Sequence, residues 1–219
     1  MVKAAKSHLG IFPQTVIVST MDDIRILLSI CVGIGLAAAC GFRVFVPLLC
    51  LSIASMTGYV HVDDSFAWVG TWPALIAFAV ATVVEVAAYY VPYIDNLLDS
   101  IAVPAATAAG VCVAALAITD VDPFWRWTVA IIGGGGVAAS TQIATTKLRA
   151  ASSTITAGFG NPVLATVEVF TSSVLSVISV VWPIVAIVLV IALLAVSWVV
   201  IYFVGKHVIR LFRRKAPAA

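Results

Sequence analysis

Three charged residues stand inside long apolar stretches of the chain: Arg43 in GLAAACGFRVFVP, Glu85 in AVATVVEVAA and Glu168 in VLATVEVF. A charge at the centre of a bilayer costs about 2.5–3.5 kcal/mol on insertion scales, so such residues usually pair with an opposite charge or face water. We therefore predict that Arg43 pairs with Glu85. Glu168 is expected to pair with Lys147 or Arg149. The alternative is that such pairs are static and only fix helix packing.

The composition is typical of an integral membrane protein. Hydrophobic residues make up 63% of the chain and charged residues 10%, and the mean hydropathy is +1.15. A soluble domain carries about 25% charged residues. The net charge of +2 gives no reason to expect nucleic acid as a partner. The four cysteines lack CxxC spacing and no HExxH or GxSxG motif occurs, so we expect no metal, no cofactor and no enzyme activity.

The apolar segments predict an all-α, polytopic bundle of about six transmembrane spans. The first segment, Ile26–Met56, would measure about 45 Å as one helix against about 30 Å of hydrocarbon. We therefore expect one broken span, with Gly41 and Pro47 as the break points. The six expected spans are Ile26–Met56, Trp72–Val91, Ile101–Ile118, a fourth from Phe124 to about Lys147, Asn161–Val181 and Ile184–Val204.

The distribution of charge predicts the orientation of these spans. With six spans, the loops that hold Asp63, Asp64, Asp120 and Asp122 lie on one side of the membrane. Lys147, Arg149 and the basic tail then lie on the other side, together with Arg25. Because positive loops stay in the cytoplasm, we expect a multi-pass protein of the bacterial cytoplasmic membrane with both termini cytoplasmic.

The two halves of the sequence resemble each other. Gly33–Arg43 (GIGLAAACGFR) resembles GGGVAASTQIATTK, which lies within the stretch Gly133–Arg149. Likewise, ATVVEV at 81–86 resembles ATVEV at 165–169. Each half holds three spans, so the second copy would enter from the opposite face as an inverted repeat. The expected division is a tail at 1–21, repeats at 22–119 and 120–205, and a basic cytoplasmic tail at 206–219.

Polar and glycine residues near the two broken helices complete the candidate site. The glycine run at 133–136 allows close helix packing or an unwound backbone that lines a cavity. Asp95 and Asp99 can cap the third helix or receive cations or protons, and Asn161 before Pro162 indicates a helix start, where an anion would be attracted. The candidate pathway residues are Arg43, Glu85, Asp95, Asp99, Gln142, Lys147, Asn161 and Glu168, and the candidate broken-helix positions are Gly41, Pro47, Gly133, Gly134, Gly135 and Gly136.

These motifs resemble a family. GFRxFxP at 41–47, Glu85, VPYID at 91–95 with Asp99 and Pro104, and Gly160-Asn161 before Glu168 are similar to a widespread bacterial family of small integral membrane proteins, known mainly as a domain of unknown function. The family pattern leads us to expect charged residues where Tyr89 and Tyr90 stand. The resemblance implies a membrane location and an internally duplicated helical fold, and it implies no activity.

Three functions fit this sequence. The first is a small transporter or channel for a solute or ion, with Arg43 and the glutamates along its pathway. The second is a lipid-handling protein of the scramblase kind, and the third is a membrane scaffold that carries nothing. A cavity at mid-depth that reaches Arg43 and Glu85 would favour transport, an open lateral groove would favour lipid, and a sealed pair would favour the scaffold. The expected partner is the lipid bilayer, and a homo-oligomer with a second copy of the chain is an open alternative.

Overall fold

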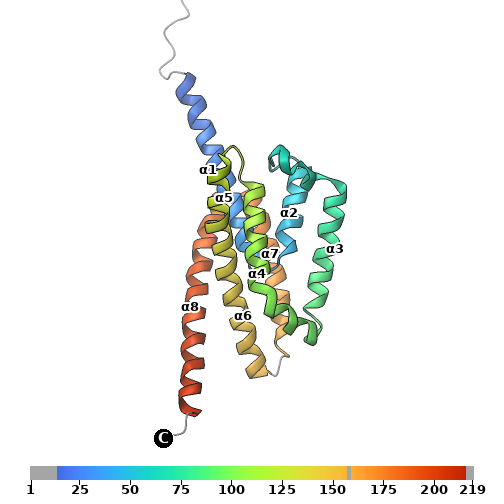
Figure 1. Ribbon diagram of the computed structural model, residues 1–219, viewed down its shortest axis with the longest axis vertical. Helices are drawn as coiled ribbons and strands as arrows, with labels where there is room; N and C mark the ends of the chain where they lie inside the picture. Colours follow the sequence, from blue (N-terminus) through green and yellow to red (C-terminus); the bar gives the residue numbers. More distant parts are fainter. Residues whose placement is uncertain (1–13, 157–158, 216–219) are drawn as a thin grey trace, which may run out of the picture.

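The computed structural model describes residues 14–156 and 159–215, which contain helices and no strand. Residues 14–21 of the predicted N-terminal tail belong to the first helix, and residues 206–215 of the predicted basic tail belong to the last. The rest of both tails lies outside the described residues. In chain order the elements are α1 (Gln14–Cys40), α2 (Phe45–Met56), the 3₁₀ helix η1 (Asp64–Gly70), α3 (Trp72–Ala88), α4 (Pro92–Ala117), α5 (Pro123–Val129), the π-helix η2 (Ala130–Gly135), α6 (Gly136–Thr156), α7 (Asn161–Val181) and α8 (Pro183–Lys215) (Figure 1).

Several of these helices are long and apolar enough to cross a membrane. Four qualify alone, namely α1 from Asp22, α4 from Leu97, α7 and α8. A fifth span results if η1 and α3, bent by 61°, are counted together. Helices α5, η2 and α6 follow one another without a break and run along the same bundle (Figure 1). Large apolar side chains on the outer faces, such as Val83 and Ile191, are exposed as a lipid-facing surface requires. The chain is a polytopic helical membrane protein.

The first broken segment turns back instead of crossing the bundle. Helix α1 ends at Cys40, and α2 begins only four residues after Gly41. One surface hollow of about 430 Å³ is lined by Arg25 near the start of the apolar part of α1 (Asp22–Cys40), by His61 after α2 and by Pro183 at the start of α8. The α1–α2 pair therefore enters and leaves at the same end of the bundle. The prediction of a break at Gly41 is confirmed, but the prediction of one broken span through the membrane is wrong.

The residues of the turn explain this reversal. A Cβ atom on Gly41 would lie 2.7 Å from the carbonyl oxygen of Ala138 and closer still to Cβ of Thr141, so only glycine lets α1 end against α6. Pro47 does not break a helix, because it lies in the first turn of α2, where a missing N–H costs little. The reversal occurs at Gly41 and Phe42, and Pro47 belongs to the returning helix.

The hairpin changes the predicted orientation of the chain. Because α8 starts beside the hollow and extends for 33 residues, about 50 Å at 1.5 Å per residue, it ends far from the start of α1. Figure 1 shows the first residues of α1 and the last residues of α8 at opposite ends of the molecule. The expectation that both termini lie on one side of the membrane rested on a span that does not cross, and it does not fit this arrangement.

The hollow also fixes the direction of the other helices. Ala117 at the end of α4 and Val180 at the end of α7 both line the hollow, whereas α8 starts there with Pro183. Helix α4 therefore runs opposite to α8, and α7 runs opposite to α3. Helices α1 and α5 both start at this end, since Asp120, just before α5, lines the hollow as well. The stretches that begin at Gly33 and Gly133 therefore run in the same direction, which an inverted repeat does not allow for this pair.

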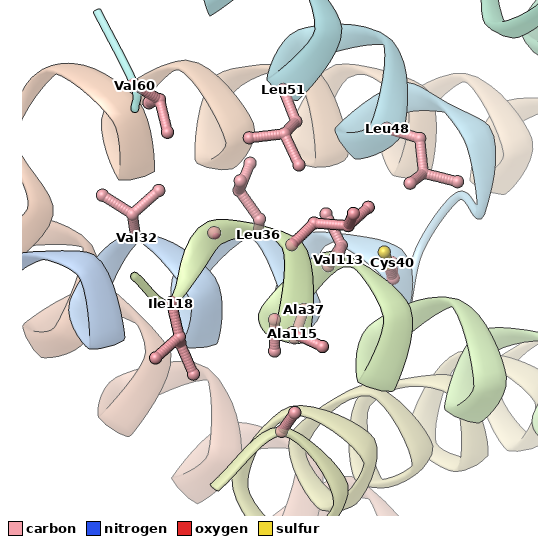
Figure 2. Packing of buried hydrophobic residues seen from close by; sticks show 14 of the residues in the cluster. Val32, Leu36, Ala37, Cys40, Leu48, Leu51, Val60, Val113, Ala115 and Ile118 are labelled. Atoms are coloured by element: carbon pink, nitrogen blue, oxygen red, sulfur yellow. The ribbon is translucent and has the colours of Figure 1, made fainter. Parts of the chain in front are cut away.

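Small residues let the central helices pack closely. Leu36 of α1, Leu51 of α2 and Val113 of α4 meet in the main apolar cluster, which is filled in by alanines (Figure 2). Nearby, a Cβ atom on Gly134 would lie 2.7 Å from the carbonyl oxygen of Gly110, so η2 and α4 touch through their backbones. Of the two readings of the glycine run, close packing is the correct one. The run is helical throughout, with Gly133–Gly135 in η2 and Gly136 opening α6.

Candidate functional site

Five polar or aromatic side chains from five elements meet inside the bundle. They are Arg43 from the α1–α2 turn, Tyr89 after α3, Asp99 of α4, Arg149 of α6 and Glu168 of α7, and we call them the arginine cluster. The residues Arg43 and Arg149 are each 1% exposed and Glu168 is 7% exposed. These three side chains are therefore shielded from water and lipid, whereas the side chain of Asp99 is 19% exposed at the edge of the cluster.

Glu168 lies at the centre of the cluster. Its Oε2 atom is 3.1 Å from Nη2 of Arg43. Arg149 Nε donates to Oε1 of Glu168 at 2.9 Å, and Arg149 Nη2 pairs with Oε2. The Arg149 contact is thus bidentate, which is the strong geometry for a guanidinium and a carboxylate. The predicted pairing of Glu168 with Lys147 or Arg149 is confirmed for Arg149.

Tyr89 holds both guanidinium groups by its ring. The Cζ atom of Arg43 lies 3.8 Å from the ring centroid and that of Arg149 lies 4.4 Å away. Such stacking attracts a cation without using its N–H donors. Tyr89 was not among the candidate site residues expected from the sequence. The available signal was the spacing of four residues between Glu85 and Tyr89, which puts both on one helix face.

Glu85 does not pair with Arg43 within the described residues. Its carboxylate accepts the backbone N–H groups of Val44 at 2.8 Å and Phe45 at 3.0 Å. The first turn of a helix has N–H groups without intrahelical acceptors and a positive dipole end, so the break before α2 creates the anion-binding position that Glu85 fills. The predicted Arg43–Glu85 pair is wrong, and Arg43 pairs with Glu168 instead.

Asp99 approaches the cluster from α4, with Oδ1 4.0 Å from Nη1 of Arg149. Helix α4 begins at Pro92, earlier than expected, so Asp99 lies in its third turn and does not cap it. The prediction of a capping role for Asp99 is therefore wrong. The side chain of Asp95 lies outside the described residues.

Arg43 does not use all of its donors within the cluster. Its Nη2 atom serves both Glu168 and the carbonyl oxygen of Ala165, the latter at 3.1 Å. Its Nε and Nη1 atoms are buried and have no hydrogen-bond partner in the described part of the chain. The hydroxyl of Thr141, which packs beside Gly41, is likewise buried and has no hydrogen-bond partner among the described residues.

The remaining predicted residues lie outside the cluster. Gln142 is buried on α6 and donates to Oγ1 of Thr146 at 3.3 Å. Asn161 begins α7, as predicted, and is hydrogen-bonded to Ser153 at 3.0 Å. Lys147 is half-buried on α6. No group of three metal-ligating side chains occurs among the residues that the structure describes.

Comparison with known proteins gives the family and no activity. No curated protein matches the chain, and no solved structure matches it. The family model described as a domain of unknown function (DUF4126) matches residues 30–202, which include the whole arginine cluster and Glu85. The chain belongs to the DUF4126 family.

Proposed function

We propose that the protein is a small transporter or channel for a solute or ion, and that the arginine cluster is the centre of its pathway. The observation that carries this proposal is the α1–α2 hairpin. Its tip places Arg43 against Glu168 and Arg149, where α3, α4, α6 and α7 converge. Interrupted helices inside a membrane bundle commonly surround the binding region of a transporter.

The energetics of the cluster support a role beyond packing. Well-packed apolar side chains of similar volume often stabilise a fold as well as a buried ion pair does, or better. Each buried donor without an acceptor costs about 1–3 kcal/mol, and Arg43 has two such nitrogen atoms among the described residues. Ionisable groups inside a membrane protein are retained at this cost mainly where ions, protons or solutes pass.

The charge distribution favours one orientation. The last part of α8 carries Lys206, Arg210, Arg213, Arg214 and Lys215. The opposite end, around the hollow, carries Asp63, Asp64, Asp120 and Asp122 together with Arg25 and Arg126, so acidic residues outnumber basic ones among these. By the positive-inside rule, the end of α8 would face the cytoplasm of a bacterial cell, and the hollow would face outward. In this arrangement α3–α4 and α7–α8 run in opposite directions, as the two copies of an inverted repeat would.

A scaffold without transport is the second candidate, and the burial of the cluster favours it. The hollow at the outer end is lined by residues such as Ser29, Tyr59 and Thr119, and none of its lining residues belongs to the cluster. A transporter with this structure is in a closed state and must open to work. A lipid-handling role has less support, since the groove of about 360 Å³ between α7 and α8 is lined almost wholly by apolar side chains such as Phe170 and Leu189.

Flux measurements in proteoliposomes test the proposal. The panel contains a monovalent cation, a monovalent anion and a neutral solute, each with wild type, Glu168→Gln and Glu85→Gln. Asp64→Asn is the matched control, because Asp64 is an exposed carboxylate in the outer loop. We expect flux of one solute class in wild type and in the control, and altered flux in both glutamate variants. Flux equal to that of empty liposomes for every solute would overturn the proposal in favour of the scaffold.

A further inference from the structure

We infer that the arginine cluster is a binding site for a small, planar, monovalent oxyanion, such as nitrate or a carboxylate, and that Glu168 is its built-in occupant. In the closed structure the carboxylate of Glu168 lies where the oxygens of the solute would bind. This inference rests on the proposed function, since it names the solute class that the pathway would take.

The geometry of the two arginines carries the inference. Arg43 and Arg149 approach the same oxygen, Oε2 of Glu168, from two different elements. Guanidinium groups present planar arrays of N–H donors that match a planar oxyanion. Because the ring of Tyr89 covers the faces of both groups, their edges remain available for acceptors. The arrangement is suited to an anion with two or three coplanar oxygens.

The unused donors show that Glu168 does not fill this site. Nε and Nη1 of Arg43 are buried and have no acceptor among the described residues, although Arg43 is only 1% exposed. The buried hydroxyl of Thr141 beside the same turn adds a third polar group without a partner there. A free anion can place oxygens against several of these donors, whereas the tethered carboxylate of Glu168 satisfies only Nη2 of Arg43.

The net charge of the site limits how an anion can bind there. Arg43 and Arg149 are balanced by Glu168 and Asp99, while Glu85 is held by the first N–H groups of α2. An added negative charge in such a dry site is costly. Glu168 therefore takes one proton from water, becomes a neutral carboxylic acid and leaves the arginines, and the anion takes its place with no change in net charge.

Anion binding is thus coupled to a proton. The charged or titratable groups that face Glu168 and its neighbours come from every element packed there. They are Arg43 on the turn, Arg149 on α6, Asp99 on α4, Glu85 on α3 and Tyr89 directly after α3, with Cys40 of α1 near Glu85. Glu168 is the carboxylate that both arginines hold directly. Replacement of Glu168 by a neutral side chain should therefore allow the anion to bind without a proton.

Nitrate binding to the purified full-length protein tests this inference. The shift in thermal unfolding is measured against nitrate concentration, with chloride at equal ionic strength for comparison. In wild type we expect nitrate to stabilise more at acidic than at neutral pH. In Glu168→Gln we expect half-saturation at a nitrate concentration at least about tenfold lower at neutral pH, because a tethered competitor of high effective concentration has been removed. Adding Arg43→Gln to the Glu168→Gln variant should abolish the stabilisation by nitrate.

If Glu168→Gln does not fold, Glu168→Asp replaces it, since the shorter side chain keeps the charge and weakens the contact with the arginines. Equal stabilisation by nitrate and chloride in all variants would overturn the inference. Flux of a cation or neutral solute without nitrate binding would also overturn it, while leaving the proposed transport intact. Nitrate binding that needs Arg43, in a protein without flux, would support the site and remove the transport.

Discussion

Nη2 of Arg43 lies 3.1 Å from Oε2 of Glu168 and joins the tip of the α1–α2 hairpin to α7. The same carboxylate is held from the other side by Arg149 of α6. One acidic side chain thus joins α7 to the preceding helix α6 and to a turn far away in the sequence, and its removal affects all three elements.

The first prediction concerns this shared carboxylate. Glu168→Ala should lower the free energy of unfolding by about 3–5 kcal/mol, because it leaves buried guanidinium groups without their acceptor. The measurement is thermal unfolding in detergent. Asp64→Ala, at an exposed loop position, should change stability far less, and equal losses in the two variants would contradict the central position of Glu168.

The second prediction concerns the ring of Tyr89. Tyr89→Phe should keep most of the stability, because the phenyl ring still covers both guanidinium faces. Tyr89→Leu should lose about 1–3 kcal/mol, since each cation–π contact with a desolvated arginine is worth about 1–2 kcal/mol. The thermal unfolding curves of the two variants measure this difference in stability. A loss in Tyr89→Phe as large as in Tyr89→Leu would show that the hydroxyl is the important group.

The third prediction concerns the glycine at the hairpin tip. Gly41→Ala should destabilise the protein by more than about 1 kcal/mol, because the new Cβ atom would lie 2.7 Å from the backbone oxygen of Ala138. Gly136→Ala is the matched control. A Cβ atom there has no neighbour within 4 Å, so alanine should be neutral or stabilise the helix by up to about 1 kcal/mol. If Gly41→Ala and Gly136→Ala change the stability by the same amount, close packing does not explain why a glycine is needed at position 41.

The fourth prediction concerns orientation. In a variant that lacks the four native cysteines, Asp64→Cys should react with a membrane-impermeant maleimide on intact cells. Thr154→Cys should react only after the membrane is opened, because it lies near the end of α6, far from the outer hollow. Both positions are exposed on the protein. The reverse labelling pattern would invert the orientation that the basic tail predicts.

The fifth prediction concerns Asp63 in the outer loop. The N–H group of Ser65 and the guanidinium of Arg126, 3.1 Å away, lower the pKa of this carboxyl below its usual value. Its contribution to stability is therefore present above the unfolded pKa of about 4 and is lost as the pH falls through the lower folded value. Hydrogen exchange in the loop before η1 should rise in this acidic range. Asp63→Asn should exchange fast at every pH, and a pH response that survives in this variant would rule Asp63 out.

The sequence predicts the helices better than their directions. Asn161 and Trp72 begin helices close to where their patterns place them, and the chain breaks at Gly41 as expected. A hydropathy profile is the same whether the chain continues or reverses after a break. The reversal depends on the contact of Gly41 with α6, which no local pattern contains.

The charged partners were predictable in kind but not in pairing. The sequence predicts that Glu168 pairs with Lys147 or Arg149, and the structure has Arg149. Arg43 had two glutamates as candidate partners, and the predicted partner, Glu85, was the wrong one. The choice was made by backbone groups, because the N–H donors of Val44 and Phe45 take Glu85. Hydrogen bonds to a helix end that exists only after the reversal are beyond a reading of the sequence.

The contact between Gly110 of α4 and Gly134 of η2 has a consequence for the evolution of the chain. Neither position has a side chain to lose, so a larger residue on one helix cannot be offset by a smaller one on the other. Two ordinary packed residues can exchange volume over time, whereas these two can only be kept together. Across the family we expect both glycines to be retained jointly, with no compensating pairs of substitutions between them.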